Sequence, residues 1–209
     1  MASLLIFSFL SCKKDTNTPD KPADPVTEHY PSKVGSYWVY HWYSIDSNGV
    51  ETLLSEIDTI SIVGDTLLSG KKYAIYKEMF MGWQQNLTYR RDSSGYIVDQ
   101  LGQVRYSYVN FKDSFEMGSD TGIWNYYSKM FNKPDKVQVP AGSFSCVERR
   151  KVHYNDPAIP LTACGDTVIT FGTYYSPSVG EIKSESGWYM ELKRECKKRE
   201  RRLVSYYLP

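Results

Sequence analysis

One stretch limits the fold more than any other: residues 37–45, which are mostly aromatic or β-branched and lead directly into Asp46-Ser47-Asn48-Gly49. Such residues favour extended strands, because their side chains pack well on a pleated surface. Asn-Gly is a strong hairpin signal, since both positions tolerate the positive φ of a tight turn. The segment therefore predicts a strand that turns back antiparallel through about Glu51 to Val63, where Gly64-Asp65 is expected to close it.

The same rhythm of short strand and short turn continues along the chain. The further strands that we expect are 72–81, 86–91, 96–100, 104–109, 136–154, 166–175, about 181–185, 189–196 and 202–208. Short connections make neighbours in sequence neighbours in the sheet, and the many Tyr and Trp residues also favour strands. The sequence predicts an all-β domain with at most short helices: a strongly curved antiparallel sheet, half-barrel or barrel-like, with meander topology.

Residues 111–135 break this rhythm. Aromatic and apolar side chains are scattered there among Gly, Ser, Asp and Asn without clean alternation. Long irregular excursions inside a compact domain are uncommon and are often functional loops. Two interpretations stay open: a loop that fills the core, or a flap that covers a ligand on the open face of the sheet.

The N-terminus resembles a bacterial lipoprotein signal. A short apolar run ends at Leu10-Ser11-Cys12, the pattern in which a signal peptidase cleaves before a cysteine that is then lipidated. Residues 1–11 are thus the expected signal peptide and Cys12 the lipidation site. No Lys or Arg precedes the apolar run, which indicates that the true signal begins a few residues earlier.

Residues 12–31 read as the lipidated cysteine and a flexible polar spacer. The segment is rich in Lys, Asp, Thr and Asn and holds four prolines, at 19, 22, 25 and 31, a composition that stays extended and solvated. Residues 32–209 remain for a single β-rich domain, enough for a real core. Acyl chains on Cys12 would hold such a domain on a membrane, and we expect an outer-membrane lipid anchor, with the periplasmic or surface face left open.

The net charge and the cysteine content limit the partners, disulfides and metal sites that the chain can have. The formal net charge is +1, so no overall field favours nucleic acid. Beyond Cys12 the cysteines are Cys146, Cys164 and Cys196, which allow at most one disulfide and one free thiol. The expected hairpin register separates Cys146 from Cys164. No metal-binding spacing is present, and we expect no cofactor.

Three short motifs carry a resemblance. They are Val139-Pro140-Ala141-Gly142-Ser143-Phe144-Ser145-Cys146, then Tyr174-Tyr175-Ser176-Pro177-Ser178-Val179-Gly180-Glu181-Ile182-Lys183, and Val34-Gly35-Ser36-Tyr37-Trp38-Val39-Tyr40. Together they resemble a pattern of uncharacterised Bacteroidota outer-membrane lipoproteins. The resemblance implies a curved antiparallel sheet, similar to the half-barrel of lipoprotein-carrier proteins, and no catalytic residues. The motifs themselves look structural, with Gly142 and Gly180 in tight turns and Val179 buried.

Two groups of side chains are candidates for binding. The aromatic residues that we expect to face a ligand are Trp83, Trp124, Tyr126, Tyr127 and Trp188, although aromatic residues in strands are more often core. The basic residues that we expect at a hairpin tip, facing an anionic surface, are Lys197, Lys198, Arg199, Arg201 and Arg202. The alternative for this basic group is a solvated turn that protects a sheet edge from aggregation.

The motifs of the common enzyme classes are absent from the sequence. We therefore expect a non-enzymatic, membrane-tethered envelope lipoprotein that binds or carries an apolar or amphiphilic ligand in its curved sheet. The alternatives are a surface glycan-binding lipoprotein, which would need exposed coplanar aromatic rings, and an enzyme of unknown class.

Overall fold

Alternating side chains build one long antiparallel sheet. The computed structural model describes residues 30–120, 124–155, 161–187 and 195–209. Within these ranges the strands are β1 (Tyr37–Ile45), β2 (Glu51–Leu68), β3 (Lys71–Phe80), β4 (Gln84–Ser93), β5 (Tyr96–Asp99), β6 (Val104–Ser107), β7 (Ser114–Asp120), β8 (Trp124–Val139), β9 (Gly142–Tyr154), β10 (Val168–Ser176), β11 (Gly180–Ser186) and β12 (Lys198–Tyr207). The predicted all-β class with meander topology is confirmed.

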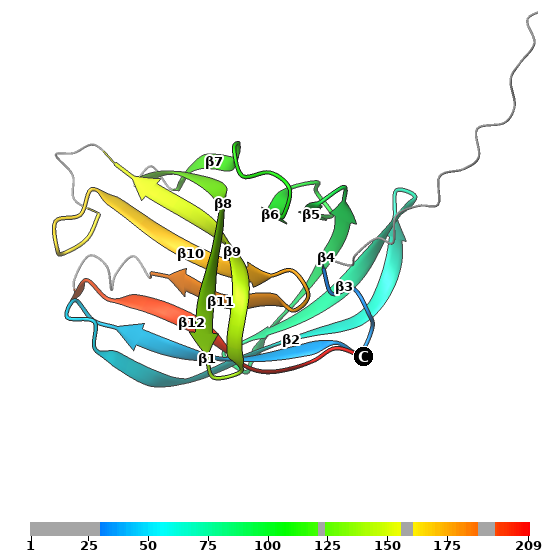
Figure 1. Ribbon diagram of the computed structural model, residues 1–209, viewed down its shortest axis with the longest axis horizontal. Helices are drawn as coiled ribbons and strands as arrows, with labels where there is room; N and C mark the ends of the chain where they lie inside the picture. The colour runs from blue at the N-terminus through cyan, green and yellow to red at the C-terminus, as the bar shows by residue number, and fades with distance from the viewer. Residues whose placement is uncertain (1–29, 121–123, 156–160, 188–194) are drawn as a thin grey trace, which may run out of the picture.

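The order of the strands is β6-β5-β4-β3-β2-β1-β12-β11-β10-β9-β8-β7. The first and last strands are therefore neighbours in the middle of the sheet, where Tyr37 pairs with Tyr207 and Ile45 with Lys198. The two edges, β6 and β7, follow each other in the chain. Figure 1 shows that the sheet curls so far that these edges approach, which makes it nearly a closed barrel.

The predicted turn after β1 is confirmed and its chemistry is visible. The Asp46 carboxylate accepts hydrogen bonds from the backbone N–H groups of Asn48 (2.8 Å) and Val50 (2.9 Å). Gly49 has a φ of +78°, a conformation that costs glycine nothing. Register shifts within the pairs of β1 with β2 and with β12, and of β2 with β3, add local twist and help to curl the sheet.

Aromatic side chains fill the inside of the curl. The Trp38 indole N–H donates to the Val179 carbonyl (2.7 Å) and the Tyr40 hydroxyl to the Glu181 carbonyl (3.0 Å). Tyr106 of β6 stacks on Tyr175 of β10, with ring centroids 3.9 Å apart. Because β6 and β10 are far apart in the sheet, this contact spans the interior and holds the barrel closed.

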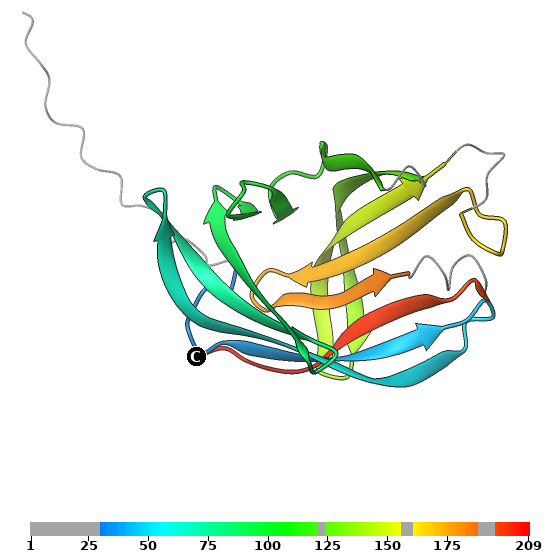
Figure 2. The ribbon, with the colours of Figure 1, turned by 180° about the vertical axis from the view of Figure 1, so that it is seen from behind.

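The long β8–β9 hairpin reaches beyond its place in the sheet. Figures 1 and 2 show it running across β10, β11 and β12, and the backbone N–H of Ala141 at its tip donates to the Leu203 carbonyl (3.1 Å). Cys146 of this arm is buried in the main apolar cluster and is the free cysteine of the described residues. Burial raises the pKa of its thiol to about 12, so the thiol stays protonated.

Three local predictions were wrong. Residues 111–135, expected to be irregular, contain β7 and most of β8, because their aromatic side chains alternate across a hairpin once a register shift near Ser114 to Met117 is allowed. Gly64-Asp65 does not end β2, which continues to Leu68 through a register shift between Ile62 and Gly64.

The third error concerns the basic C-terminal segment. Residues 197–201 were expected to form the tip between the last two strands, but β12 begins at Lys198 and pairs with both β1 and β11. Most of the predicted strand 189–196 lies outside the described residues.

Candidate functional site

The interior of the barrel leaves little free space. A cavity there measures about 30 Å³ and is lined mainly by aromatic side chains, together with Arg90 and Glu181. A single water needs roughly 10–15 Å³, so this space holds a water or two. A carried ligand of the size of a lipid does not fit there in this conformation.

Two larger hollows lie along β6 to β11. One, of about 270 Å³, is lined by residues that include Trp124, Lys151 and Phe171. The other, of about 360 Å³, lies between the two sheet edges, with Arg105 on one side and Phe115 on the other. Arg149 lines both hollows, and we refer to the pair as the groove.

Strand periodicity explains why polar side chains face the groove. Arg149, Lys151 and His153 stand at alternate positions of β9 and therefore project from the same face. Their partners on β10 are Thr173, Phe171 and Ile169. Cations and aromatic rings are thereby interleaved on one surface.

One carboxylate lies at the centre of the groove. Glu116 of β7 accepts hydrogen bonds from the Ser128 hydroxyl (2.7 Å), from the Arg149 guanidinium, and from the Lys151 ammonium at 3.5 Å. Burial alone would raise the pKa of Glu116, but Arg149, Ser128 and Lys151 outweigh it, so the pKa of this carboxyl lies below its ordinary value. Glu116 is therefore ionised at neutral pH and shared between two cations.

The groove keeps a surplus of positive charge. Its lining holds three cations, Arg105, Arg149 and Lys151, against two carboxylates, Glu116 and Glu185, which leaves one unit of positive charge. Glu116 is the carboxylate that pairs with Arg149 and Lys151. Arg105, on the opposite edge, is exposed and makes no ion pair with the described residues. An anionic group entering the groove would therefore meet uncompensated cations in a partly desolvated place, where charge pairs are stronger than in open water.

Aromatic rings surround these cations. The Lys151 ammonium lies 3.9 Å from the ring centroid of Tyr126. His153 meets Trp124 edge to face, with centroids 5.2 Å apart, and Phe171 at 5.5 Å. Trp124 also packs on the buried residues Leu161 and Ile169. The groove thus offers apolar surface directly beside positive charge.

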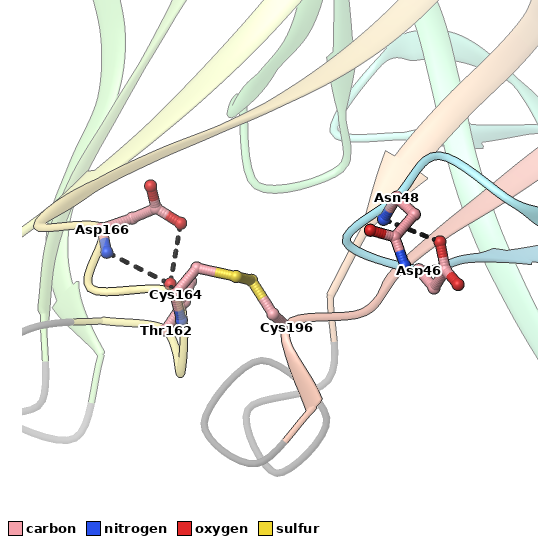
Figure 3. Close-up of a disulfide and its surroundings, with 6 residues drawn as sticks. All are labelled: Asp46, Asn48, Thr162, Cys164, Asp166 and Cys196. Carbon is pink, nitrogen blue, oxygen red and sulfur yellow. Dashed lines mark hydrogen bonds between the residues drawn. A yellow bond between two sulfur atoms is a disulfide. The ribbon is translucent and has the colours of Figure 1, made fainter.

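A disulfide between Cys164 and Cys196 joins the β9–β10 loop to the segment before β12 (Figure 3). The loop is also held by Thr162, whose hydroxyl donates to Asp166 (2.7 Å) and accepts from the N–H groups of Cys164 and Asp166, each at 3.2 Å. One disulfide and one free thiol agree with the sequence expectation. Persistent disulfides belong to oxidising compartments.

The structure separates the five aromatic candidates. Trp124 and Tyr126 line the groove. Tyr127 lies on the opposite face of β8, near Tyr154, and Trp83 is 74% exposed in the turn after β3. Trp188 and the lipidation candidate Cys12 lie outside the described residues.

The basic candidates are engaged with carboxylates of the same chain. Their partners are Glu195 for Lys197, Glu56 for Arg199, Asp58 and Glu181 for Arg201, and Glu51 and Glu200 for Arg202. Arg201 is only 8% exposed. Lys198, at the start of β12, is exposed. These pairings give no support to contact with an anionic surface, which stays a prediction.

Sequence reasoning missed Glu116, Arg149 and Lys151. A signal was present: β9 carries a charge at every position from Glu148 to Lys151, so charged side chains must lie on both faces of a strand with one face toward the interior. His153 continues this face of β9.

Within the described residues no group of three or more His, Cys, Asp or Glu side chains is placed to hold a metal ion. In the same ranges no helix is both long and apolar enough to cross a membrane.

Comparison with protein-family models gave no match, and comparison with curated proteins gave none. Two solved structures are similar. One is a "putative lipoprotein" of Parabacteroides distasonis, with a TM-score of 0.52 and 14% identity over 86% of this chain and 98% of that chain. The other is a "putative exported protein with YmcC-like fold" of Bacteroides fragilis, with a TM-score of 0.51 and 14% identity over 85% of this chain and 98% of that chain. At this level of identity the likeness establishes the fold: the chain shares the curled antiparallel sheet of these two proteins, as its motifs implied.

Proposed function

We propose that the chain is a lipid-anchored protein of the cell envelope that binds an amphiphile with an anionic head group in the groove, without catalysing a reaction. The observation that carries the proposal is the pairing of surplus positive charge at Arg149 and Lys151 with the rings of Trp124, Tyr126 and Phe171. Such a surface binds an acidic head and an apolar chain at once.

The location rests on three supports. The sequence has a lipoprotein-type signal ending at Cys12 and a polar spacer, the Cys164–Cys196 disulfide suits an oxidising compartment, and both similar structures carry names of exported or lipid-anchored proteins. We further propose that the lipid anchor is attached at Cys12 and lies in the outer membrane. Metabolic labelling with radioactive palmitate tests it, with a Cys12→Ala variant as control; incorporation that does not depend on Cys12 contradicts it.

The groove accounts for an amphiphile better than the barrel interior does. The interior cavity of about 30 Å³ is far below the 300–1,000 Å³ of ordinary ligand pockets. The two hollows of the groove, about 270 and 360 Å³, fall in or near that range. The ligand class expected from the sequence is retained, but its place moves from the centre of the sheet to the region around β9.

A fluorescent fatty acid such as 11-(dansylamino)undecanoic acid tests the binding site. We expect saturable binding that weakens at least about tenfold in Trp124→Ala, which removes the largest apolar wall, and in Lys151→Met, which keeps the chain length and removes the charge. Each tenfold loss corresponds to about 1.4 kcal/mol. Trp83→Ala is the matched control, because Trp83 lies on an exposed turn.

Competition between the fluorescent probe and other amphiphiles tests the preference for an anionic head group independently of the variants. Alkyl carboxylates and alkyl phosphates should compete with the probe, whereas alkyltrimethylammonium salts of the same chain length should compete much less. Equal competition by both signs of charge, or equal affinity of Trp124→Ala and the native chain, would contradict the proposal.

A second candidate, glycan binding, is favoured by one observation on the outer face. Tyr37 and Tyr207 stack with centroids 5.9 Å apart and planes 28° apart, and they are 45% and 53% exposed. Solvent-facing aromatic pairs suit the apolar faces of sugar rings. Affinity electrophoresis through gels containing polysaccharide tests this, with retardation by the native chain but not by Tyr207→Ala as the supporting result.

A further inference from the structure

The interior cavity is closed by a residue from outside the sheet. Tyr30 precedes β1 by several residues, at the start of the described chain, and yet it is only 7% exposed. Its ring packs against Tyr76 and Tyr106, with centroids 5.8 and 5.9 Å away. The end of the spacer thus enters the barrel and contributes to its core.

Tyr30 and Pro31 form a wall between two spaces. Both residues line the interior cavity of about 30 Å³, and both also line a surface hollow of about 170 Å³ beside the C-terminal Pro209. Without this wall the two spaces would join, and the surface would open directly into the barrel. The dipeptide Tyr30-Pro31 therefore separates the two spaces, and we refer to it as the stopper.

The stopper is held by contacts that do not involve strand pairing. The Tyr76 hydroxyl donates to the Pro31 carbonyl, and the proline ring packs beside Gly180. Neither Tyr30 nor Pro31 belongs to a strand. The dipeptide can therefore leave without breaking a ladder hydrogen bond of the barrel.

The walls of the site are suited to an aromatic ring with a hydroxyl. Trp38, Tyr40, Tyr76, Tyr106 and Tyr175 line it, and the Arg90 guanidinium carbon lies 4.6 Å from the ring centroid of Tyr76. Rings of this kind favour tilted or stacked aromatic neighbours.

Polar groups at the same site have unused hydrogen-bonding capacity. The hydroxyl of Tyr106 and the Nε of Arg90 are buried and make no hydrogen bond with the described residues. Burial raises the pKa of Tyr30 to about 12, so its phenol is neutral. A neutral phenolic occupant with freedom to reorient could use these donors.

We propose that the barrel interior is a binding site for a phenolic ring, separate from the groove, and that Tyr30 of the spacer occupies it in the resting protein. A free phenol or a phenolic compound would enter through the hollow beside Pro209 when Tyr30 and Pro31 move out of the cavity. The site is thus linked to the segment that leads to the predicted membrane anchor.

The test uses the full chain with Cys12→Ser, so that no acyl chain complicates the titration, and p-cresol as the probe. Tyr30→Ala should bind p-cresol with one-to-one stoichiometry in calorimetry, at least about tenfold more tightly than the native chain, because the occupying ring is gone. The thermal midpoint of Tyr30→Ala should be lowered and should rise again with p-cresol, since ligands that bind only the folded state stabilise it.

Three controls make the result specific. Tyr30→Phe keeps the ring and should not gain p-cresol binding. Tyr154→Ala removes a tyrosine that is 41% exposed and does not line the cavity, and it should behave like the native chain. Cyclohexanol, similar in size but not aromatic, should stabilise Tyr30→Ala less than p-cresol does.

A folded Tyr30→Ala that binds p-cresol no better than the native chain overturns the proposal. If Tyr30→Ala does not fold alone, the same titration is made on Tyr30→Leu, which fills part of the space, and p-cresol is added during refolding of Tyr30→Ala. Recovery of structure or binding supports the site; failure of both variants to respond overturns it.

Discussion

Two charge clusters in this sheet, one buried and one partly exposed, have opposite balances. Inside the barrel, one cation, Arg201, is held by two carboxylates, at 3.1 Å from Asp58 and 2.6 Å from Glu181. In the groove, one carboxylate, Glu116, is shared by two cations, Arg149 and Lys151. The first cluster carries one unit of excess negative charge and is enclosed by the core, whereas the second carries excess positive charge beside open hollows.

The difference separates a structural cluster from a binding surface. Burial would raise the pKa of Glu181, but Arg201 outweighs it and holds the pKa of that carboxyl below its ordinary value. Arg201 also lies 4.7 Å from the ring centroid of Tyr40, so aromatic core encloses the ion pair. The groove cluster borders open hollows, where a ligand can supply the missing negative charge.

Removal of Arg201 should have the largest effect on stability. Arg201→Leu leaves the carboxylates of Asp58 and Glu181 buried without their cation, and breaking a buried ion pair in this way costs about 3–5 kcal/mol. Urea unfolding at pH 7 measures the loss. The matched control is Lys72→Met, which breaks the ion pair of Lys72 with Asp65, whose side chains are 71% and 49% exposed, and which should cost no more than about 1 kcal/mol. Equal losses in both variants would remove the distinction between buried and exposed pairs.

The disulfide should come next. Cys164 and Cys196 are 32 residues apart, and the chain-entropy model gives about 3–4 kcal/mol for a loop of that length. The double variant Cys164→Ser, Cys196→Ser should lose this amount in urea unfolding, and reduction of the native chain should reproduce the loss. Because the disulfide holds the loop after β9, we also expect weaker amphiphile binding. An unchanged affinity for the amphiphile would show that the disulfide does not contribute to the shape of the groove.

The shared carboxylate gives a smaller, pH-dependent effect. Glu116 has a lowered pKa in the folded state, so its contribution to stability is present above the ordinary carboxyl pKa and is lost as pH falls through the lowered value. Glu116→Gln should lose about 1 kcal/mol at pH 7, reduced by solvent because the Glu116 side chain is 36% exposed. The difference from the native chain should vanish in acid.

The same variant tests the function of the groove. Without Glu116, Arg149 and Lys151 keep their full charge, so affinity for the anionic fluorescent probe should rise at pH 7 while stability falls. Weaker binding by Glu116→Gln would mean that the carboxylate organises the site and does not compete with the ligand.

Local patterns of the sequence were sufficient for the sheet and for its turns. The alternation in residues 37–45 and the Asn48-Gly49 turn are short-range signals, and the structure confirms both. The motif glycines were also interpreted correctly, with φ values of +134° at Gly142 and +95° at Gly180. These features depend on residues adjacent in the chain.

Contacts between distant strands could not be predicted in this way. Residues 111–135 looked irregular because the alternation of β7 and β8 is interrupted by register shifts, which no local pattern reveals. The basic segment looked like a solvated tip because its partners Glu51, Asp58 and Glu181 are far away in sequence. The groove depends on the same long-range curl, and for that reason Trp124 was found but Glu116 was not.

A comparison of Trp83 with Trp124 tests how far residue type alone can identify a binding residue. Of the variants considered, Trp83→Ala should have the smallest effect on stability. Both were candidates on residue type alone, but Trp83 is 74% exposed and Trp124 only 9%. Trp83→Ala should change the free energy of unfolding by less than about 0.5 kcal/mol, as expected for a surface position. It should also leave binding of the fluorescent fatty acid unchanged, whereas Trp124→Ala should reduce both stability and affinity. If Trp83→Ala weakened binding instead, the ligand would lie at the β3–β4 turn, and the charge balance around Glu116 would have to be explained by stability alone.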